Sequence, residues 1–507
     1  MSILLSNIIP NIIVNKLMLP EILIAGLACF ILLIDLIVSK NHKFITYFLT
    51  QIGLLVVMMV VYKNFSNLYN LQTYQEENIF LINNGFTLNT KINFMKLIFL
   101  SLVFIIFIYM NDYFKTRNQF NGEYLVLNLL SMLGAMLLVS SNNFFNFYFA
   151  IEMLSLPIYA LVAMEAKNIN LEASIKYFIL SAVFSGILLY GLSLVYGASG
   201  SLDFKSTINF IDTQHISMLF NVGVMLIFIG IFFKLSLAPF HLWIPDVYQG
   251  AGTTVVMLIS SLPKIAMVSI FSSFLAEVFS KYINYNWQTF LIVISILSML
   301  IGNFGAILQS NFKRLLGYSA IGHAGFILLG LAANNAAGIT AANIYVILYA
   351  FMTIGILGVI AIFSNNQLEF DDIRYFSGLS KKHPWISGML LILLLSMSGI
   401  PPTAGFYAKF LIIKALIGAN LVWVAIVALL LSLISLFYYL KIIKTMYFLN
   451  NDFLSDNQDN YAGVSVPTLQ LKSNYSSIIV LSINSICILS VGIYPLLIDY
   501  VVKKFFN

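Results

Sequence analysis

Charged residues are scarce in this sequence. Asp, Glu, Lys and Arg make up 9% of the 507 residues, whereas 60% are hydrophobic and the mean hydropathy is +0.93. A soluble domain carries about 25% charged residues, so this chain could not cover itself with a solvated surface. The composition therefore excludes a soluble protein and indicates a protein with many membrane-spanning segments.

Cysteine is nearly absent, and so are the motifs of nucleotide and cofactor binding. The two cysteines, Cys29 and Cys487, lie far apart inside apolar runs, without a CxxC pair that could hold an iron–sulfur cluster or structural zinc. They are expected to be small apolar packing residues. There is no glycine-rich nucleotide loop and no nucleophile elbow, and five scattered histidines do not suggest haem ligation. We therefore expect no cofactor and no metal in this chain.

Long apolar runs recur along the whole sequence. Each has about 20 residues, enough to cross a hydrocarbon core of about 30 Å, and their unbroken character predicts helices rather than a barrel. Fourteen spans are predicted, at 18–38, 44–63, 93–110, 123–140, 143–164, 174–197, 217–240, 253–275, 289–308, 313–332, 340–363, 386–412, 420–447 and 477–501. The expected fold is an all-α polytopic membrane protein, with residues 1–507 in a single integral membrane domain.

Lysine and arginine are unevenly divided between alternate loops. The odd-numbered loops carry 14 of these residues, and the even-numbered loops and the termini carry 8. By the positive-inside rule, the odd-numbered loops face the cytoplasmic or matrix side, and both termini face the other side. Lys91 and Lys96 are expected to be loop residues on the side of the termini. Loop charge of this kind also explains the net charge of +6 without a nucleic acid partner.

Four lysines remain inside the predicted spans: Lys234, Lys264, Lys409 and Lys414. A lysine at the bilayer centre costs at least about 2.5–3.5 kcal/mol, so such residues are expected to be functional. Lys414 lies near the end of its span and is expected at the interface. Glu152 is the acidic residue that the sequence places deep in a span, where it could pair with a buried lysine. The alternative for each of these residues is a structural contact between helices.

Two predicted spans contain helix-breaking residues. The seventh has KLSLAPFHLW around Pro239, and the twelfth has SMSGIPPTAGFYAKF with Pro401 and Pro402. Such breaks at membrane depth are tolerated only where the backbone is buried in protein or lines a hydrated cavity. An offset of five spans reverses the direction of the chain, so the breaks predict two inverted repeats of five helices, at about 123–275 and 289–447. N-terminal helices at 1–110 and a C-terminal helix at 477–501 complete the domain.

Two histidines extend the polar set inside the predicted spans. His241 follows the first break, and His323 lies inside the tenth span. Histidine titrates near neutral pH and can relay protons, although a loop position for His241 and a hydrogen-bonded core histidine at 323 are the alternatives. A chain of lysine and histidine bridged by water would pass a proton through Lys264 toward Lys409.

Five blocks of the sequence resemble the antiporter-like membrane subunits of NADH:ubiquinone oxidoreductase (respiratory complex I), in particular its subunit 2, whose bacterial counterpart is chain N. In order along the chain they are FAIEMLSLPIYALVA, LEASIKYFILSAVFSGILLYGLSLVYG, FKLSLAPFHLWIPDVYQGA, NFKRLLGYSAIGHAGF and SMSGIPPTAGFYAKF. The resemblance covers roughly residues 120–450. It implies fourteen spans, two inverted five-helix repeats and discontinuous helices at the seventh and twelfth spans.

The resemblance also implies roles for individual residues. Glu152 would pair with Lys234 in a half-channel open to one side, Lys264 would be the central relay, and Lys409 would serve the second half-channel. NADH, FMN, iron–sulfur clusters and ubiquinone would be used by partner subunits, whose electron transfer drives proton translocation. The chain would thus be enzymatic only as a subunit of a proton-translocating NADH:ubiquinone reductase.

The expected partners and location follow from the same resemblance. The partners would be other complex I subunits, including sister antiporter-like subunits, and membrane lipids. Frequent Phe, Tyr, Ile, Asn and Lys suit an AT-rich genome and favour the mitochondrial inner membrane, with the bacterial plasma membrane as the alternative. The second functional hypothesis is a subunit of a multisubunit Na⁺/H⁺ antiporter, and the third is a scaffold with a dry interior.

Overall fold

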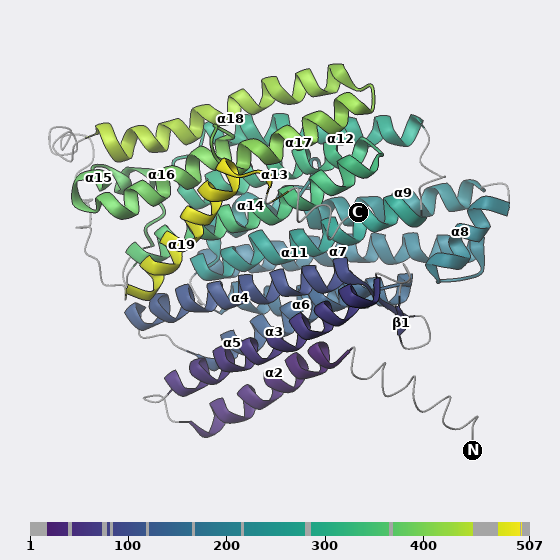
Figure 1. Cartoon of the computed structure of the whole chain (residues 1–507), viewed down its shortest axis with the longest axis horizontal. Coiled ribbons are helices and arrows are strands. Elements are labelled where there is room, and N and C mark those ends of the chain that lie inside the picture. The colour runs from purple at the N-terminus through teal and green to yellow at the C-terminus, as the bar shows by residue number, and fades with distance from the viewer. Residues whose placement is uncertain are drawn as a thin grey trace.

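The computed structural model describes residues 18–38, 43–72, 79–81, 85–117, 121–164, 168–213, 217–278, 285–364, 369–449, 475–496 and 498. These residues form a bundle of helices that lie side by side along one direction (Figure 1). In chain order the elements are α2 (Leu19–Ile37), α3 (Phe44–Gln72), β1 (Ile79–Leu81), β2 (Phe86–Leu88), α4 (Thr90–Arg117), α5 (Gly122–Ser140), α6 (Phe144–Ala163), α7 (Asn168–Ser199), α8 (Phe204–Thr213), α9 (Met218–Leu235), α10 (Trp243–Gly250), α11 (Thr253–Ser273), the π-helical turn η2 (Phe274–Val278), α12 (Tyr285–Ile307), α13 (Phe312–Ala332), α14 (Ala336–Phe363), the 3₁₀ turn η3 (Ile373–Phe376), α15 (Leu379–Lys382), α16 (Pro384–Ser398), α17 (Ala404–Gly418), α18 (Val422–Phe448) and α19 (Tyr475–Ile493).

The described helices agree with the fourteen predicted spans. Thirteen are long and apolar enough to cross a membrane, and the short helices α16 and α17 together make one more. The seventh span is discontinuous, since α9 ends and α10 follows, and the twelfth consists of α16 and α17. The helix of the last span, α19, ends at Ile493, ahead of Pro495. The rest of the predicted 477–501 lies largely outside the described residues.

The two ends of the bundle differ in their loops. We call the end with the odd-numbered, Lys- and Arg-rich loops the inner end, and the other the outer end. In Figure 1 the inner end carries α15 and the outer end carries α8 and β1. A hairpin that the sequence did not predict lies at the outer end, where β1 pairs antiparallel with β2 and Phe80 lies opposite Thr87.

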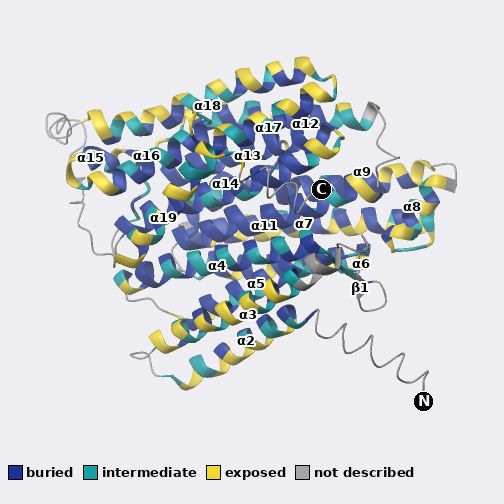
Figure 2. Cartoon of the chain, viewed as in Figure 1, coloured by how far each residue is buried: buried dark blue, intermediate teal, exposed yellow. Residues whose placement is uncertain are grey.

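Three helices form the buried centre of the bundle. The most apolar stretch of α11 is buried along its whole length, and those of α13 and α14 are 94% and 83% buried, against 28% for α2. Figure 2 shows the same gradient, with buried residues concentrated on the central helices and exposed residues on α2, α3 and α18. Because α11, α13 and α14 do not face lipid, a charged side chain on them is surrounded by protein.

Two expectations about single residues were wrong. Lys96 is not a loop residue, because its ammonium group is 1% exposed and lies 2.5 Å from the carboxylate of Glu21, tying α4 to α2. Cys29 and Cys487 are free cysteines exposed on the bundle surface, so neither packs inside it. The position of a residue in the sequence does not tell whether its side chain faces the other helices or the surface of the bundle.

Candidate functional site

The first break ends α9 directly after Lys234. Ser236 caps the helix in the left-handed conformation, with φ of 69°, and Pro239 lies in the irregular stretch before α10. The amide of Ala238, which the break leaves without a helical partner, donates to Ser298 Oγ of α12 at 2.9 Å. His241 is buried in this stretch, and its Nδ1 has no hydrogen-bond partner among the described residues. The break therefore sets Lys234 at an irregular segment enclosed by protein.

Three hydroxyl groups surround the ammonium group of Lys234. It donates to Ser155 Oγ of α6 at 2.8 Å, to Ser181 Oγ of α7 at 2.9 Å and to Tyr159 Oη of α6 at 3.3 Å. Tyr159 and Ser181 also bond to each other. Lys234 is 8% exposed, so these hydroxyls replace the water that an ammonium group would otherwise bind.

The expected ion pair between Glu152 and Lys234 is not formed in this structure. The ion pairs of the described residues do not include one between these two side chains, and Glu152 Oε1 is buried without a hydrogen-bond partner among those residues. Glu152 precedes Ser155 by three positions and Tyr159 by seven, so it shares a face of α6 with two of the hydroxyls that hold Lys234. Glu152 thus lies about one turn of helix from Ser155 and two turns from Tyr159, and its carboxylate does not pair with the ammonium group.

A set of ion pairs at the inner end fixes α10, the second half of the seventh span. Asp246 accepts from Lys176 of α7 at 3.0 Å and from Arg314 of α13 at 2.7 Å. All three groups are partly exposed, so we regard the pairs as a modest electrostatic tie between α10 and its neighbours.

The second break separates α16 from α17 and is formed by close backbone contact. Gly399 ends α16 with φ of +84°, and residues Pro401 and Pro402 follow in the turn. A Cβ on Gly405 would lie 1.8 Å from the carbonyl oxygen of Ser396, so only glycine lets α17 pack this closely on α16. Lys409 lies just beyond the break and donates to the free carbonyl of Ser398 at 2.8 Å. Lys414, on the same helix, is exposed as expected.

Lys234 and Lys409 do not occupy equivalent positions around their breaks. Lys234 precedes its break, and Lys409 follows the second one. The residue 162 positions after Lys234, the offset that relates Pro239 to Pro401, is Ser396. The two spans therefore share a broken helix, but their lysines lie on opposite sides of the break in chain order.

The central lysine is the most enclosed of the set. Lys264, in the middle of α11, is 3% exposed, and its Nζ lies 3.5 Å from the hydroxyl of Tyr349 and 4.9 Å from the centre of that ring. Pro263 precedes it without ending the helix. The tyrosine ring faces the ammonium group and supplies a cation–π contact in place of water.

His323 links the central lysine to further tyrosines. Its ring lies 5.2 Å from that of Tyr349, its Nδ1 is 2.8 Å from Tyr345 Oη, and its Nε2 is 3.3 Å from Tyr439 Oη. In neutral imidazole one nitrogen donates and the other accepts, so both nitrogens have suitable partners. His323 is thus hydrogen-bonded, buried and in contact with the partner of Lys264.

A small cavity of about 10 Å³ lies between His323 and Lys409. Its wall includes Asn303, Phe326 and Tyr345, and the ammonium group of Lys409 lies 5.9 Å from the centre of the Phe326 ring. A space of roughly 10–15 Å³ is enough for one water molecule when polar partners surround it. The cavity could therefore complete the connection between the histidine and the lysine.

The structure thus brings together some of the predicted residues. Lys264, His323 and Lys409 form a connected polar series through Tyr349 and the cavity, while Lys234 and Glu152 belong to a separate cluster on α6, α7 and α9. Sequence reasoning included Ser181 and Tyr349 among the polar residues of the interior, but it missed the other two hydroxyl partners of Lys234. Ser155 and Tyr159 could have been found, because they repeat at helical spacing from Glu152. Tyr345 and Tyr439 carry no such signal.

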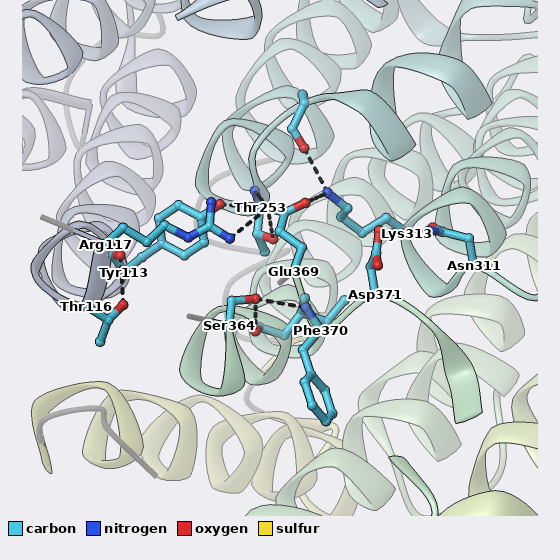
Figure 3. Close-up of polar contacts among 12 residues, drawn as sticks. Tyr113, Thr116, Arg117, Thr253, Asn311, Lys313, Ser364, Glu369, Phe370 and Asp371 are labelled. Carbon is cyan, nitrogen blue, oxygen red and sulfur yellow. Dashed lines mark hydrogen bonds and ion pairs between the residues drawn. The ribbon is translucent and has the colours of Figure 1, made fainter. Parts of the chain in front are cut away.

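A second cluster that the sequence did not indicate lies at the inner end, around Glu369 (Figure 3). Its carboxylate is ion-paired with Lys313 of α13 and lies 3.7 Å from Arg117 of α4. It also accepts from Tyr113 Oη at 2.6 Å, and from the amide and hydroxyl of Thr253, both at 3.1 Å. Burial alone would raise the pKa of Glu369, but Lys313 and Arg117 outweigh burial and hold the pKa at about 2. The cluster joins α4, α11 and α13 at the first residue of α11.

Comparisons with known proteins agree with this geometry. Residues 141–435 match the model of a family described as NADH:quinone oxidoreductase/Mrp antiporter, TM. NADH-quinone oxidoreductase subunit N of Ruthia magnifica subsp. Calyptogena magnifica is 38% identical over 94% of this chain and 95% of the relative. The protein of the same name from Coxiella burnetii is 38% identical over 97% of both chains. These relatives are bacterial and do not support the mitochondrial location that composition favoured.

Solved structures show the same fold. A chain of respiratory complex I from Thermus thermophilus, solved with bound aureothin, has a TM-score of 0.76 at 26% identity and covers 94% of this chain and 97% of its own. A chain of the Mrp complex from Dietzia sp. DQ12-45-1b has a TM-score of 0.81 at 18% identity, with 97% of each chain covered, and supports the fold alone. This chain therefore belongs to the NADH:quinone oxidoreductase/Mrp antiporter family of membrane proteins, together with the NADH-quinone oxidoreductase subunits N.

Proposed function

We propose that this chain is a membrane subunit of a respiratory NADH:quinone oxidoreductase and that it carries protons across the membrane. Electron transfer from NADH to quinone in partner subunits would supply the driving force, with FMN and iron–sulfur clusters held there. The near full-length likeness to bacterial subunits N supports this assignment over a cation/proton antiporter. It also favours the bacterial plasma membrane, with other subunits of the complex, sister antiporter-like chains among them, and lipids around the exposed helices.

One observation carries the proton-transfer part of the proposal: a connected series of ionisable side chains buried at the centre of the bundle. Lys264 contacts Tyr349, the ring of Tyr349 packs on His323, and a cavity the size of one water separates His323 from Lys409. Ionisable residues inside a membrane protein are costly and are retained mainly where they move ions or protons. Hydrophobic packing alone would be served better by leucine at each position.

The hydrogen-bonding chemistry of the series suits stepwise transfer. A lysine ammonium group can give a proton to a neighbouring water or hydroxyl, and a tyrosine hydroxyl can donate and accept at once. The ring contact between Tyr349 and His323 carries no proton, so the proton would reach His323 through water and one of its hydroxyl partners, Tyr345 or Tyr439. When it enters one nitrogen and leaves from the other, the ring changes tautomer and exchanges the roles of these two tyrosines. Lys409 then receives the proton across the cavity, beside the carbonyl of Ser398.

Lys234 would act as a gated partner of this series. Its hydrogen-bonding partners are Ser155, Tyr159 and Ser181, none of which contacts Lys264 through a hydrogen bond in the described part of the chain. An approach of the Glu152 carboxylate would favour the charged form of Lys234, and its withdrawal would favour proton release. We propose that coupling to the partner subunits acts by changing the distance between these two groups.

The test uses the assembled complex in membrane vesicles. We expect Lys264→Ala to reduce the protons pumped per NADH oxidised, because it removes the centre of the series. Lys414→Ala is the matched control, since that lysine is exposed on α17 and outside the series. Full assembly and unchanged pumping with Lys264→Ala and Lys234→Ala would refute the relay. Sodium-dependent transport without any requirement for NADH would instead favour an antiporter.

A further inference from the structure

A large apolar cavity opens at the inner end of the bundle, beside α2, which lies at the edge (Figure 1). It has a volume of about 500 Å³, within the range of about 300–1,000 Å³ that ligand pockets occupy. Its walls come from the end of α2, the first half of α5 and the end of α6. Leu32, Leu36 and Ala160 on these walls are exposed, so the cavity is open to the surface that faces lipid.

The lining of the cavity changes from polar to apolar with depth. On α5 it extends from Glu123 to Leu130, seven positions and a rise of about 10 Å. On α2, Leu32 lies about one turn deeper in the bundle than Asp35, and Ala160 lies about one turn before the inner end of α6. The cavity therefore has charged groups at the inner end and an apolar interior, in the same order as a phospholipid of the inner leaflet.

Two carboxylates form the charged rim. The carboxyl group of Asp35 packs on Gly122, the first residue of α5, where a Cβ would have no room, and Glu123 follows directly. Lys43 binds Asp35 Oδ2 at 3.2 Å, whereas Asp35 Oδ1 is buried without a hydrogen-bond partner among the described residues. The side chain of Asp35 is only 12% exposed, and buried polar atoms are normally hydrogen-bonded. The rim thus offers an open acceptor and one carboxylate more than Lys43 neutralises.

The depth and the charge of the cavity indicate what occupies it. A helix that crossed the membrane would need an apolar groove of about 30 Å, whereas the lining on α5 extends for about 10 Å. An acyl chain enters from one leaflet only, so a groove of this depth suits it. Anionic head groups are bound by basic pockets, and two carboxylates would repel them. A primary ammonium group carries three N–H donors, which match the open oxygen of Asp35 and the carboxylate of Glu123.

We propose that this cavity binds a phospholipid with a primary amine in its head group, of the phosphatidylethanolamine class. The ammonium group lies between Asp35 and Glu123 and donates to both, while one acyl chain fills the apolar cavity along α5. The phosphate accepts from Lys43, whose three donors serve Asp35 and the phosphate together. The bound lipid holds α2 against α5 and α6 at the inner end. This inference is independent of the proton relay.

The first experiment locates the lipid in the assembled complex. The purified complex is placed in nanodiscs that contain phosphatidylethanolamine with a photoreactive diazirine on one acyl chain, and mass spectrometry identifies the residues that are cross-linked on illumination. We expect cross-links within residues 126–130 of α5 and 160–164 at the end of α6. Unlabelled phosphatidylethanolamine should compete at least about tenfold better than phosphatidylglycerol or phosphatidylcholine, a factor that corresponds to about 1.4 kcal/mol.

The second experiment separates charge from shape. Asp35→Asn/Glu123→Gln keeps the size of both side chains and removes both charges, so the tenfold preference for phosphatidylethanolamine should be lost. Ala160→Phe fills the cavity and should abolish cross-linking of every phospholipid there. The matched control is Glu172→Gln, which removes an exposed carboxylate that is paired with Lys176 and lies outside the cavity. Assembly on native gels and NADH oxidation check that each variant folds.

The outcomes decide the proposal in either direction. Cross-linking that prefers phosphatidylethanolamine and loses this preference in Asp35→Asn/Glu123→Gln is the expected result. Equal competition by all three lipids would show a site for acyl chains alone and overturn the head-group recognition, even where the double variant fails to assemble. Absence of cross-links at the cavity in the assembled complex would show that a neighbouring subunit covers it, and would overturn the lipid site. None of these outcomes involves proton pumping, so the proposed function is tested separately.

Discussion

The ion cluster around Glu369 should contribute more to stability than the exposed charge pairs of the protein. Lys313 is 0% exposed and the Glu369 side chain is 16% exposed, so the pair lies where water does not replace a lost partner. In Glu369→Gln the amide can still accept from Tyr113 and Thr253, but Lys313 and Arg117 keep their charge and lose the carboxylate that pairs with both. Removing one partner of a buried ion pair costs about 3–5 kcal/mol. We expect that loss in the free energy of unfolding.

The measurement is the detergent-induced unfolding midpoint of the purified protein, with helix content as the signal. Asp372→Asn is the matched control, because its partner Arg374 is 62% exposed and a surface pair contributes about 0–1 kcal/mol. Adding Lys313→Met to Glu369→Gln should restore most of the lost stability, since a buried pair can be replaced by apolar groups with little net cost. A Glu369→Gln protein within about 1 kcal/mol of the parent would refute the reasoning.

Three further predictions concern pH and the two breaks. The pKa of Glu369 is lowered in the folded state, so its ionised form stabilises the fold above its ordinary pKa of 4.5, and that contribution is lost as the pH falls toward 2; a fall of the unfolding midpoint over this range, absent in Glu369→Gln, would confirm it. Gly405→Ala should destabilise the protein by about 1–3 kcal/mol or more, because the added Cβ meets the Ser396 carbonyl, whereas Gly418→Ala, with open space around it, should be tolerated. Replacing Ser155 and Ser181 together by Ala should slow NADH-driven pumping, because hydrogen bonds to a charged group are worth about 1.5–3 kcal/mol each, and unchanged pumping would show that the hydroxyls do not control Lys234.

The fold could be predicted from the sequence to the extent that hydropathy decides it. Fourteen apolar runs became fourteen crossings, because each run had to be a helix in a membrane. The breaks near Pro239 and Pro401 could be placed to within a few residues, since proline removes a donor wherever it occurs. The burial of Lys96 could not be predicted, because its pairing with Glu21 depends on how α2 and α4 pack, and hydropathy does not encode that packing.

The site was predictable in its members and not in its contacts. A lysine inside a long apolar run is easily recognised, so Lys234, Lys264 and Lys409 could be identified from their positions in the sequence. The partners of these lysines are hydroxyl and carbonyl groups. Such groups occur in every helix, and they become partners only where helices from distant parts of the chain meet. The absence of a Glu152–Lys234 ion pair illustrates this limit, because helical spacing puts Glu152 on the same face of α6 as Ser155 and Tyr159 but does not fix its rotamer.

The position of α11 explains how the ion cluster bears on the proposed relay. Its first residue, Thr253, is bound by Glu369 at the inner end, and its last turn lines a cavity at the outer end with Ser269 and Ser273. Lys264 lies midway between them on a helix that is buried along its whole length. A helix fixed by an ion cluster at one end cannot slide without breaking that cluster. We therefore expect conformational coupling to act on the broken helices α9 and α17 around a fixed α11, which places the moving parts at Lys234 and Lys409 and leaves Lys264 as the stationary relay.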